Sequence, residues 1–273
     1  MKKRLMAAVL STAMAATMLL TGSISVQAAD AAAANDPAVE LIFTSVSVSG
    51  DSHTEAMYEF ADKVEELSGG SVTCKCYDNG SLFSSENEFD ALLNGDADLA
   101  YISFPTIATQ IPSYSMFASG YLFSSYEHMT SVLNGDIGLN KIRPQIEETL
   151  NIKPLSSFYL GSRVINTREK EINSYDDMNG LLLRMPNSEA WLFLGEALGA
   201  NPTPLSFSEL YTALQTGAVD AQDNPLPSIE SAKFYEVTKY IAITNHVVDS
   251  IMPCINGDTW NSMTEAQQEA VTE

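Results

Sequence analysis

The stretch from Leu181 to Thr244 constrains the fold more strongly than any other part of this chain. It reads LLLRMPNSEAWLFLGEALGANPTPLSFSELYTALQTGAVDAQDNPLPSIESAKFYEVTKYIAIT. An apolar, strand-like run ends on Arg184, and Pro186 then removes a backbone donor and stops regular pairing. Further on, VDAQDNP predicts a second short strand that runs into a polar turn broken by Pro225. Open α/β sheets usually place ligand groups at the carboxyl ends of their strands, which is where Arg184 lies.

Two helices are predicted between these strands. The first covers residues 188–198, is apolar at helical spacing, and is closed by Gly199. The second begins at Ser206, where Glu209 three residues later completes a capping box, and it ends at Gly217. Strands that alternate with helices in this way are typical of an α/β fold.

Arg184 at one strand end and Asn224 after the next strand are placed to converge on one acidic ligand. A guanidinium presents a planar fork that fits a carboxylate through two parallel hydrogen bonds. The residues alone equally allow a structural role, in which Arg184 pairs with an Asp or Glu and only stabilises the fold. Both interpretations stay open at this point.

The same stretch resembles the signature region of the substrate-binding proteins of TRAP transporters, which deliver organic acids to a membrane permease. That family's pattern is roughly LxxRxPxS/N, GAxPTPxxFSExYxALQTGxVDGQENP and KFYEVxKYxxxTxH. This chain has LLLRMPNS, GANPTPLSFSELYTALQTGAVDAQDNP and KFYEVTKYIAITNH. It departs mildly at Ala221 and Asp223, where the family usually has Gly and Glu. Weaker resemblance covers nearly all of the chain after residue 29, including Gly-Ser-Arg at 161–163.

The resemblance implies ligand contacts in the second of two lobes. Arg184 matches the arginine that usually clamps the ligand carboxylate, and Arg163 matches a second arginine that often contacts it. Asn224 matches an asparagine that hydrogen-bonds the same group, and Phe207 matches an aromatic residue that packs on the ligand. The second lobe is therefore expected to hold the acid while the first lobe contacts the remainder.

First-lobe contacts are expected from His53, where family members often have a small polar residue or histidine, and from the hydroxyls of Ser47 and Ser103, with Ser45 as a further candidate. Sialic-acid binders of the family have a glutamate near the position of Ser103, so sialic acid is disfavoured. The two arginines and the asparagine of the second lobe can saturate one carboxylate. The motif-bearing segments of the first lobe offer no arginine for another carboxylate. A hydroxylated monocarboxylate such as a hexuronate is therefore expected ahead of a C4-dicarboxylate.

A repeated sequence motif supports two similar α/β lobes. Residues 91–98 and 213–220 both read ALxxGxxD, each with a helix end, a glycine and an aspartate before an apolar strand. We assign residues 30–159 and 250–273 to the first lobe and residues 160–249 to the second. Residues 104–125, rich in aromatic and serine side chains, are expected to form an irregular loop that walls the cleft.

Residues 1–29 have the pattern of a cleaved secretory signal peptide. A basic end precedes an apolar core, and Val-Gln-Ala at 26–28 is typical of a cleavage site. A membrane anchor is the alternative, but the apolar core is short. No cysteine follows the core for lipid attachment, so the pattern indicates a periplasmic protein without a lipid anchor.

Charge and composition exclude several classes of partner. The net charge of −21 disfavours nucleic acid, which needs a basic surface, and cleavage after residue 29 would remove three basic residues and no acidic one. Three scattered histidines and three cysteines, Cys74, Cys76 and Cys254, give no metal-site spacing, and the cysteines are expected to be packing residues. Neither a cofactor nor a metal is expected.

The sequence thus predicts a two-lobe α/β periplasmic binding protein, with a hinge and an inter-lobe cleft for one organic acid. We expect a monomer, without enzymatic activity, that works with the membrane subunits of a TRAP transporter. Family members usually continue with helices that pack across both lobes, and these are expected to be missing after Glu273. A secreted hydrolase with an unrecognised site and an ABC-type binding protein for a neutral solute are the competing hypotheses.

Overall fold

The computed structural model describes residues 36–273, so the predicted signal peptide lies outside the described residues. The described chain forms two compact units. The smaller unit comprises the described residues up to Glu40, together with Phe60–Cys74 and Met263–Glu273. The larger unit comprises Leu41–Glu59 and Lys75–Ser262. No helix in this part of the chain is both long and apolar enough to cross a bilayer.

In the smaller unit, a buried glutamine ties the C-terminal helix to the other segments. Helix α11 (Glu265–Thr272) starts with a capping box between Thr264 and Gln267. Nε2 of Gln267 also donates to the Pro37 carbonyl at 2.8 Å and to the Ser71 hydroxyl at 3.3 Å. These bonds satisfy a side chain that is almost fully buried.

The strands form one sheet of ten strands, within residues 36–273, in the order β2-β1-β3-β10-β5-β8-β6-β7, with β4 beside β10 and β9 beside β5. The strands are β1 (Val39–Thr44), β2 (Val72–Tyr77), β3 (Leu99–Ile102), β4 (Ile152–Pro154), β5 (Phe158–Thr167), β6 (Leu182–Met185), β7 (Asn201–Pro204), β8 (Ala221–Pro225), β9 (Tyr240–Ala242) and β10 (Val248–Asn256). The α-helices are α2 (Ser52–Leu67), α3 (Glu88–Asn94), α4 (Phe104–Ile107), α5 (Tyr126–Leu133), α6 (Arg143–Leu150), α7 (Glu189–Ala197), α8 (Leu210–Thr216), α9 (Leu226–Ser231), α10 (Gly257–Ser262) and α11.

The repeated ALxxGxxD motif corresponds to a repeated topology. The order β1-α2-β2-α3-β3 returns as β6-α7-β7-α8-β8, with spatial orders β2-β1-β3 and β7-β6-β8. The aspartates of the two ALxxGxxD motifs make the same two hydrogen bonds. The carboxylate of Asp98 accepts from the backbone N–H of Ile42, and the backbone N–H of Asp98 donates to the Ile42 carbonyl. Asp220 makes the same two bonds with Leu182. Each aspartate therefore fixes the start of a strand, which is a structural role.

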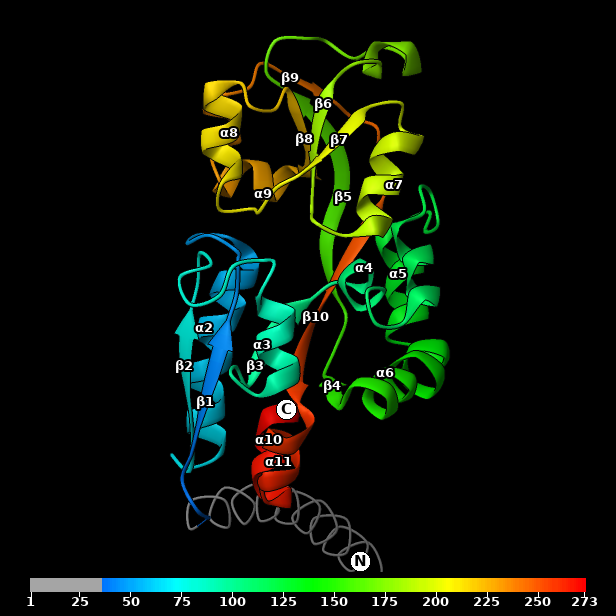
Figure 1. Ribbon diagram of the computed structural model, residues 1–273. Helices are drawn as coiled ribbons and strands as arrows, with labels where there is room; N and C mark the ends of the chain where they lie inside the picture. The colour runs from blue at the N-terminus through cyan, green and yellow to red at the C-terminus, as the bar shows by residue number, and fades with distance from the viewer. Residues whose placement is uncertain (1–35) are drawn as a thin grey trace, which may run out of the picture. The chain divides into compact units, whose positions relative to one another are not determined.

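Two long strands join the repeated segments. Strand β10 pairs antiparallel with both β3 and β5, and β5 pairs antiparallel with β8. Figure 1 shows β5 and β10 running side by side between the two groups of strands. The β6–β8 part of the sheet is covered on both faces: Leu183, Met185 and Ile165 pack with Trp191 of α7, while Val164 packs with Leu214 of α8.

Several predicted boundaries are wrong, for local reasons. The segment expected to be irregular contains α4 and a 3₁₀ helix, Pro112–Ala118, both begun by a proline at their first turn. The sequence also predicts one helix over residues 137–150. The structure has a π-helical turn, Gly138–Ile142, followed by α6, because Pro144 has no N–H to continue the i→i−4 pattern.

The signature stretch differs from the prediction at three further points. Helix α8 starts at Leu210 because the Ser206 hydroxyl bonds the Glu209 carboxylate at 2.8 Å rather than capping the backbone. Strand β8 continues through Pro225. The Gly-Ser-Arg segment lies inside β5, whereas the sequence predicts a strand over residues 153–159 that ends before it. Helix α7 and the glycines Gly199 and Gly217, both with positive φ, lie where predicted.

Candidate functional site

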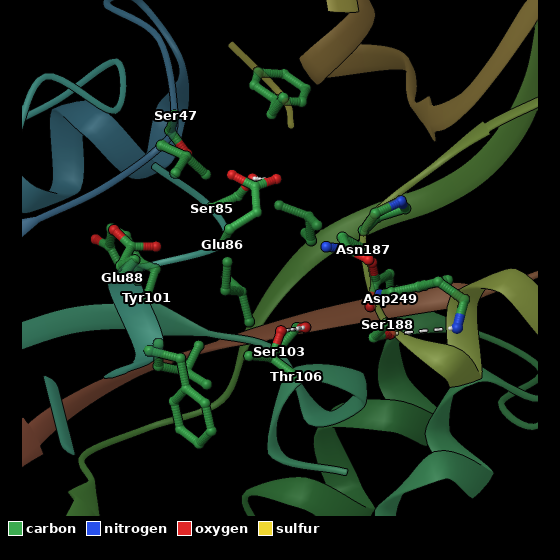
Figure 2. Close-up of a pocket in the computed structure, with 18 of the residues that line it drawn as sticks. Ser47, Ser85, Glu86, Glu88, Tyr101, Ser103, Thr106, Asn187, Ser188 and Asp249 are labelled. Carbon is green, nitrogen blue, oxygen red and sulfur yellow. Dashed lines mark hydrogen bonds between the residues drawn. The ribbon is translucent and has the colours of Figure 1, made fainter. Parts of the chain in front are cut away.

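A cavity of about 410 Å³ lies in the larger unit, at the carboxyl ends of β6 and β8. One wall comes from residues 46–110 and the other from residues 160–251. Figure 2 shows Glu86, Glu88 and Tyr101 on one side of this space and Asn187, Ser188 and Asp249 on the other. Pockets of this size hold small organic ligands.

The sheet register brings Arg163 and Arg184 to this cavity from opposite faces. Arg184 is paired with Gln222 across β6 and β8, so it shares a face with Asn224, which is paired with Val164. Arg163 is the neighbour of Val164 along β5 and therefore points to the other face. The two guanidinium groups consequently reach the cavity around the end of the sheet.

Arg184 is buried with little opposing charge. Its only hydrogen bond among the described residues runs from Nε to the Leu205 carbonyl at 2.8 Å. The pKa of Arg184 is lowered from 12.5 to about 10, chiefly by burial. Asp223 opposes this shift, the charge of Arg163 adds to it, and Glu86 opposes it weakly. The group stays cationic at neutral pH, and an anionic ligand would compensate its charge.

Arg163 is held by two acidic side chains. Its Nε donates to Oδ2 of Asp249 at 2.7 Å, and its Nη1 donates to the Asp223 carbonyl at 2.7 Å and to Oδ1 of Asp223 at 3.3 Å. Burial alone would lower the pKa of Arg163, but Asp223 and Asp249 raise it. The guanidinium lies over the Trp191 ring at 4.2 Å, and Oδ2 of Asp223 lies 3.2 Å from Nε2 of buried His246. Arg163 is thus rigidly oriented and largely neutralised.

A chain of buried amides orients Asn224. Nδ2 of Asn166 donates to the Tyr240 carbonyl, which can only accept, so Oδ1 of Asn166 must face Gln222. Gln222 donates to that oxygen at 3.0 Å and accepts from Nδ2 of Asn224 at 2.6 Å. The amide chain Asn166–Gln222–Asn224 therefore fixes which way the Asn224 amide points and leaves its Oδ1 and second N–H for the cavity.

The other predicted contacts fall into two groups. Phe207, Ser47 and Ser103 line the cavity with Arg163, Arg184 and Asn224. His53 does not line it: this buried ring bonds the carboxylate of Asp51, which does. The ligand roles of all seven residues stay predictions.

Sequence reasoning missed several lining residues. Asn187 and Ser188 belong to the quoted LLLRMPNS motif and could have been included. Trp191 is one of the apolar residues of the helix predicted over residues 188–198, and nothing in that spacing marks it as a cavity residue. Glu86 and Glu88 lie in SSENEFD, where no motif distinguishes them.

No group of three or more His, Cys, Asp or Glu side chains in residues 36–273 is arranged to hold a metal ion. All three cysteines are thiols rather than disulfides.

An α/β fold with a partly cationic cavity at its strand ends defines a small-molecule binding protein. The chain belongs to the bacterial extracellular solute-binding proteins of family 7 (DctP), whose family model matches residues 43–273. This confirms the predicted TRAP family. It is 34% identical to the sialic acid-binding periplasmic protein SiaP of Vibrio cholerae over 77% of this chain and 65% of that protein. It therefore spans about two thirds of the length of such relatives.

Solved structures confirm the two-lobe α/β fold. A TRAP periplasmic solute-binding protein of Roseobacter denitrificans with bound 3-deoxy-D-manno-oct-2-ulosonic acid is 40% identical, with a TM-score of 0.81 over 86% of this chain and 77% of that one. The sugar acid-binding protein DctPAm of Advenella mimigardefordensis, in complex with galactonate, is 29% identical, with a TM-score of 0.83 over 87% of this chain and 76% of that one.

Proposed function

We propose that this protein captures an organic acid outside the cytoplasm and delivers it to the membrane subunits of a TRAP transporter. The favoured ligand is a hydroxylated monocarboxylate such as a sugar acid. The observation that carries the proposal is Arg184, a buried cation in the cavity whose terminal nitrogens have no bond to another described residue. A carboxylate bound there would accept two parallel hydrogen bonds and supply the missing opposite charge.

The charges on the cavity wall support one carboxylate rather than two. Arg163 and Arg184 are the only basic residues among those that line it, and Arg163 already has two carboxylate partners. Glu86 and Asp90 lie on the other wall. A second ligand carboxylate would approach these groups without a cation, which is costly in a partly buried site.

The ligands bound in similar proteins also favour a sugar acid. Solved relatives hold galactonate, β-D-glucuronate and β-D-galacturonate, and another holds succinate. Secretion through a cleaved signal peptide, the absence of a lipid anchor and binding without turnover are parts of the same proposal.

The test is a calorimetric and thermal-shift panel of galactonate, glucuronate, galacturonate, sialic acid, succinate and malate. A ligand at a hundred times its Kd stabilises a protein by about 2.7 kcal/mol, which shifts the melting temperature measurably. Sugar acids are expected to bind. Binding of succinate or malate with every sugar acid silent would overturn the ligand class. Turnover of an ester or glycoside would favour a hydrolase, and tight binding of neutral sugars that is unaffected by Arg184 would favour an ABC-type protein.

A further inference from the structure

The cavity contains a buried carboxyl group with one oxygen that has no hydrogen-bond partner. Glu88, in the first turn of α3, lines the cavity and is only 4% exposed. Its Oε1 makes no hydrogen bond with any described residue, and the same holds for Oγ1 of Thr44. Among the other acidic side chains that line the cavity, Asp51 bonds His53, Asp249 bonds Arg163, and Glu86 and Asp90 are exposed to solvent.

Burial favours the neutral form of Glu88. Desolvation raises the pKa of Glu88 well above its ordinary 4.5, and the nearby Thr44 hydroxyl lowers it only in part. A neutral carboxylic acid has one O–H donor and a carbonyl acceptor. Because an unpaired buried polar group is costly, a ligand group that both donates and accepts would recover that free energy on binding.

Glu86 supplies a second acceptor on the same wall. It lies two residues before Glu88, is exposed, and accepts a hydrogen bond from the Ser85 hydroxyl at 3.1 Å. Figure 2 shows the Glu86 side chain extending into the space between the two walls. Its charge acts on Arg184, so the two groups face a common space.

We propose that Glu88, with Glu86 beside it, binds ligand hydroxyl groups at the end of the ligand away from its carboxylate. Glu88 donates to one hydroxyl and accepts from the same or a neighbouring one, while Glu86 accepts only. This inference rests on the proposed function and specifies which groups of the ligand the first wall recognises. An ammonium group would satisfy Glu86 but cannot accept the Glu88 proton, and a second carboxylate would be repelled by Glu86.

The experiment measures the Kd of galactonate by calorimetry for Glu88→Gln, Glu88→Leu and Glu86→Gln. Glu88→Gln retains a neutral donor and acceptor and is expected to stay within about threefold of the unchanged protein, whereas Glu88→Leu should raise the Kd about tenfold or more. Glu127→Leu, in the first turn of α5 and outside the cavity, is the matched control. Glu86→Gln should weaken galactonate binding and reduce the discrimination against succinate.

A test on the unchanged protein does not depend on folding of a variant. Hexanoate has the six carbons and the carboxylate of galactonate but no hydroxyl, so it should bind at least about tenfold more weakly. Equal binding of the two, or tighter binding of 4-aminobutanoate than of galactonate, would overturn the inference. Should Glu88→Leu not fold, Glu88→Ala is measured by the same criterion.

The outcomes separate this inference from the proposed function. If galactonate binds and Arg184→Lys weakens it, but Glu88→Leu leaves the Kd within twofold, only the role of Glu88 is wrong. If galactonate, glucuronate and galacturonate all fail to bind the unchanged protein, both proposals are wrong.

Discussion

Arg163 and Arg184 carry the same charge but have different surroundings. Arg163 is bonded to Asp249 and Asp223 and lies over Trp191, whereas Arg184 bonds only a carbonyl. That both arginines contact one ligand carboxylate stays a prediction. Both terminal nitrogens of Arg184 lack a hydrogen bond to a described residue, whereas Arg163 uses Nε and Nη1 and keeps only Nη2 for a ligand.

Changing Arg184→Lys tests that distinction. Lysine keeps the charge but loses the planar fork, so binding of galactonate should weaken by about 1.5–3 kcal/mol. Isothermal titration calorimetry measures the change. Arg168→Lys, outside the cavity, is the control and should leave the Kd unchanged. Unchanged affinity in a folded Arg184→Lys protein would remove the carboxylate clamp.

The amide chain makes a second prediction at this scale. Gln222→Met keeps the length of the side chain but breaks both bonds, leaving Oδ1 of Asn166 and Nδ2 of Asn224 without their partner. Unfolding free energy should fall by about 1–3 kcal/mol, as is usual for unpaired buried polar groups. Ligand affinity should fall as well, by about three- to tenfold, because the Asn224 amide can then turn. A lower melting temperature with an unchanged Kd would reduce Gln222 to a purely structural residue.

How far single residues could be predicted depends on whether a motif marks them. Arg184, Asn224 and Phe207 follow from quoted motifs, and the structure places them on one cavity. Glu88 could not be found in this way, because its importance arises from burial. An acidic residue at the start of a predicted helix is ordinarily solvent-exposed.

At the scale of elements, a β-bulge shapes the cavity. Gly161 of β5 is paired with Asp249 of β10, and Tyr159 is paired with Ser250, so Leu160 is the extra residue. Leu160 and Asp249 both line the cavity. Bulges commonly redirect side chains next to binding sites. The prediction that a strand ends before Gly161 was wrong because the bulge lets β5 continue.

Gly161 is required at this bulge by its conformation and by its neighbour. Its φ is +135°, and a Cβ there would lie 2.3 Å from Cβ of Pro225. Gly161→Ala should therefore lower the unfolding free energy by about 1–3 kcal/mol or more, measured by chemical denaturation. Gly50→Ala is the matched control, since Gly50 also has a positive φ, +85°, but no atom within 4 Å of the added Cβ. Equal losses in the two variants would show that the Pro225 contact contributes nothing.

Repeated elements were more predictable than the segment between them. The ALxxGxxD motifs predicted the same helix-to-strand junction twice, and Asp98 and Asp220 make equivalent hydrogen bonds there. Residues 104–118 were missed because their short helices are held by tertiary contacts, such as the stacked rings of Phe104 and Phe117 at 4.1 Å. Local propensity does not encode such contacts.

For the whole molecule, the sequence predicted the family and the α/β class because a long motif-dense stretch specifies both. Division into lobes at residues 30–159 with 250–273 and at residues 160–249 stays a prediction. The net charge was also known from the sequence, but the structure is needed to see that a buried cation lies inside this acidic protein. The chain carries a net charge of −21, while the proposed ligand is an anion and the arginine proposed to clamp it is buried.

Ionic strength should separate long-range repulsion from the attraction of the cavity. Between about 0.01 M and 0.15 M salt the Debye length falls from about 30 Å to about 8 Å, which screens the net charge more than direct contacts. The association rate constant of galactonate is therefore expected to rise by about two- to fivefold, with a smaller change in the dissociation rate constant. Stopped-flow fluorescence of Trp191, which lines the cavity, reports binding, and Trp260→Phe removes the other tryptophan signal. A rate that falls with added salt would show instead that the field of Arg184 and Arg163 reaches the approaching ligand and outweighs the repulsion by the rest of the chain.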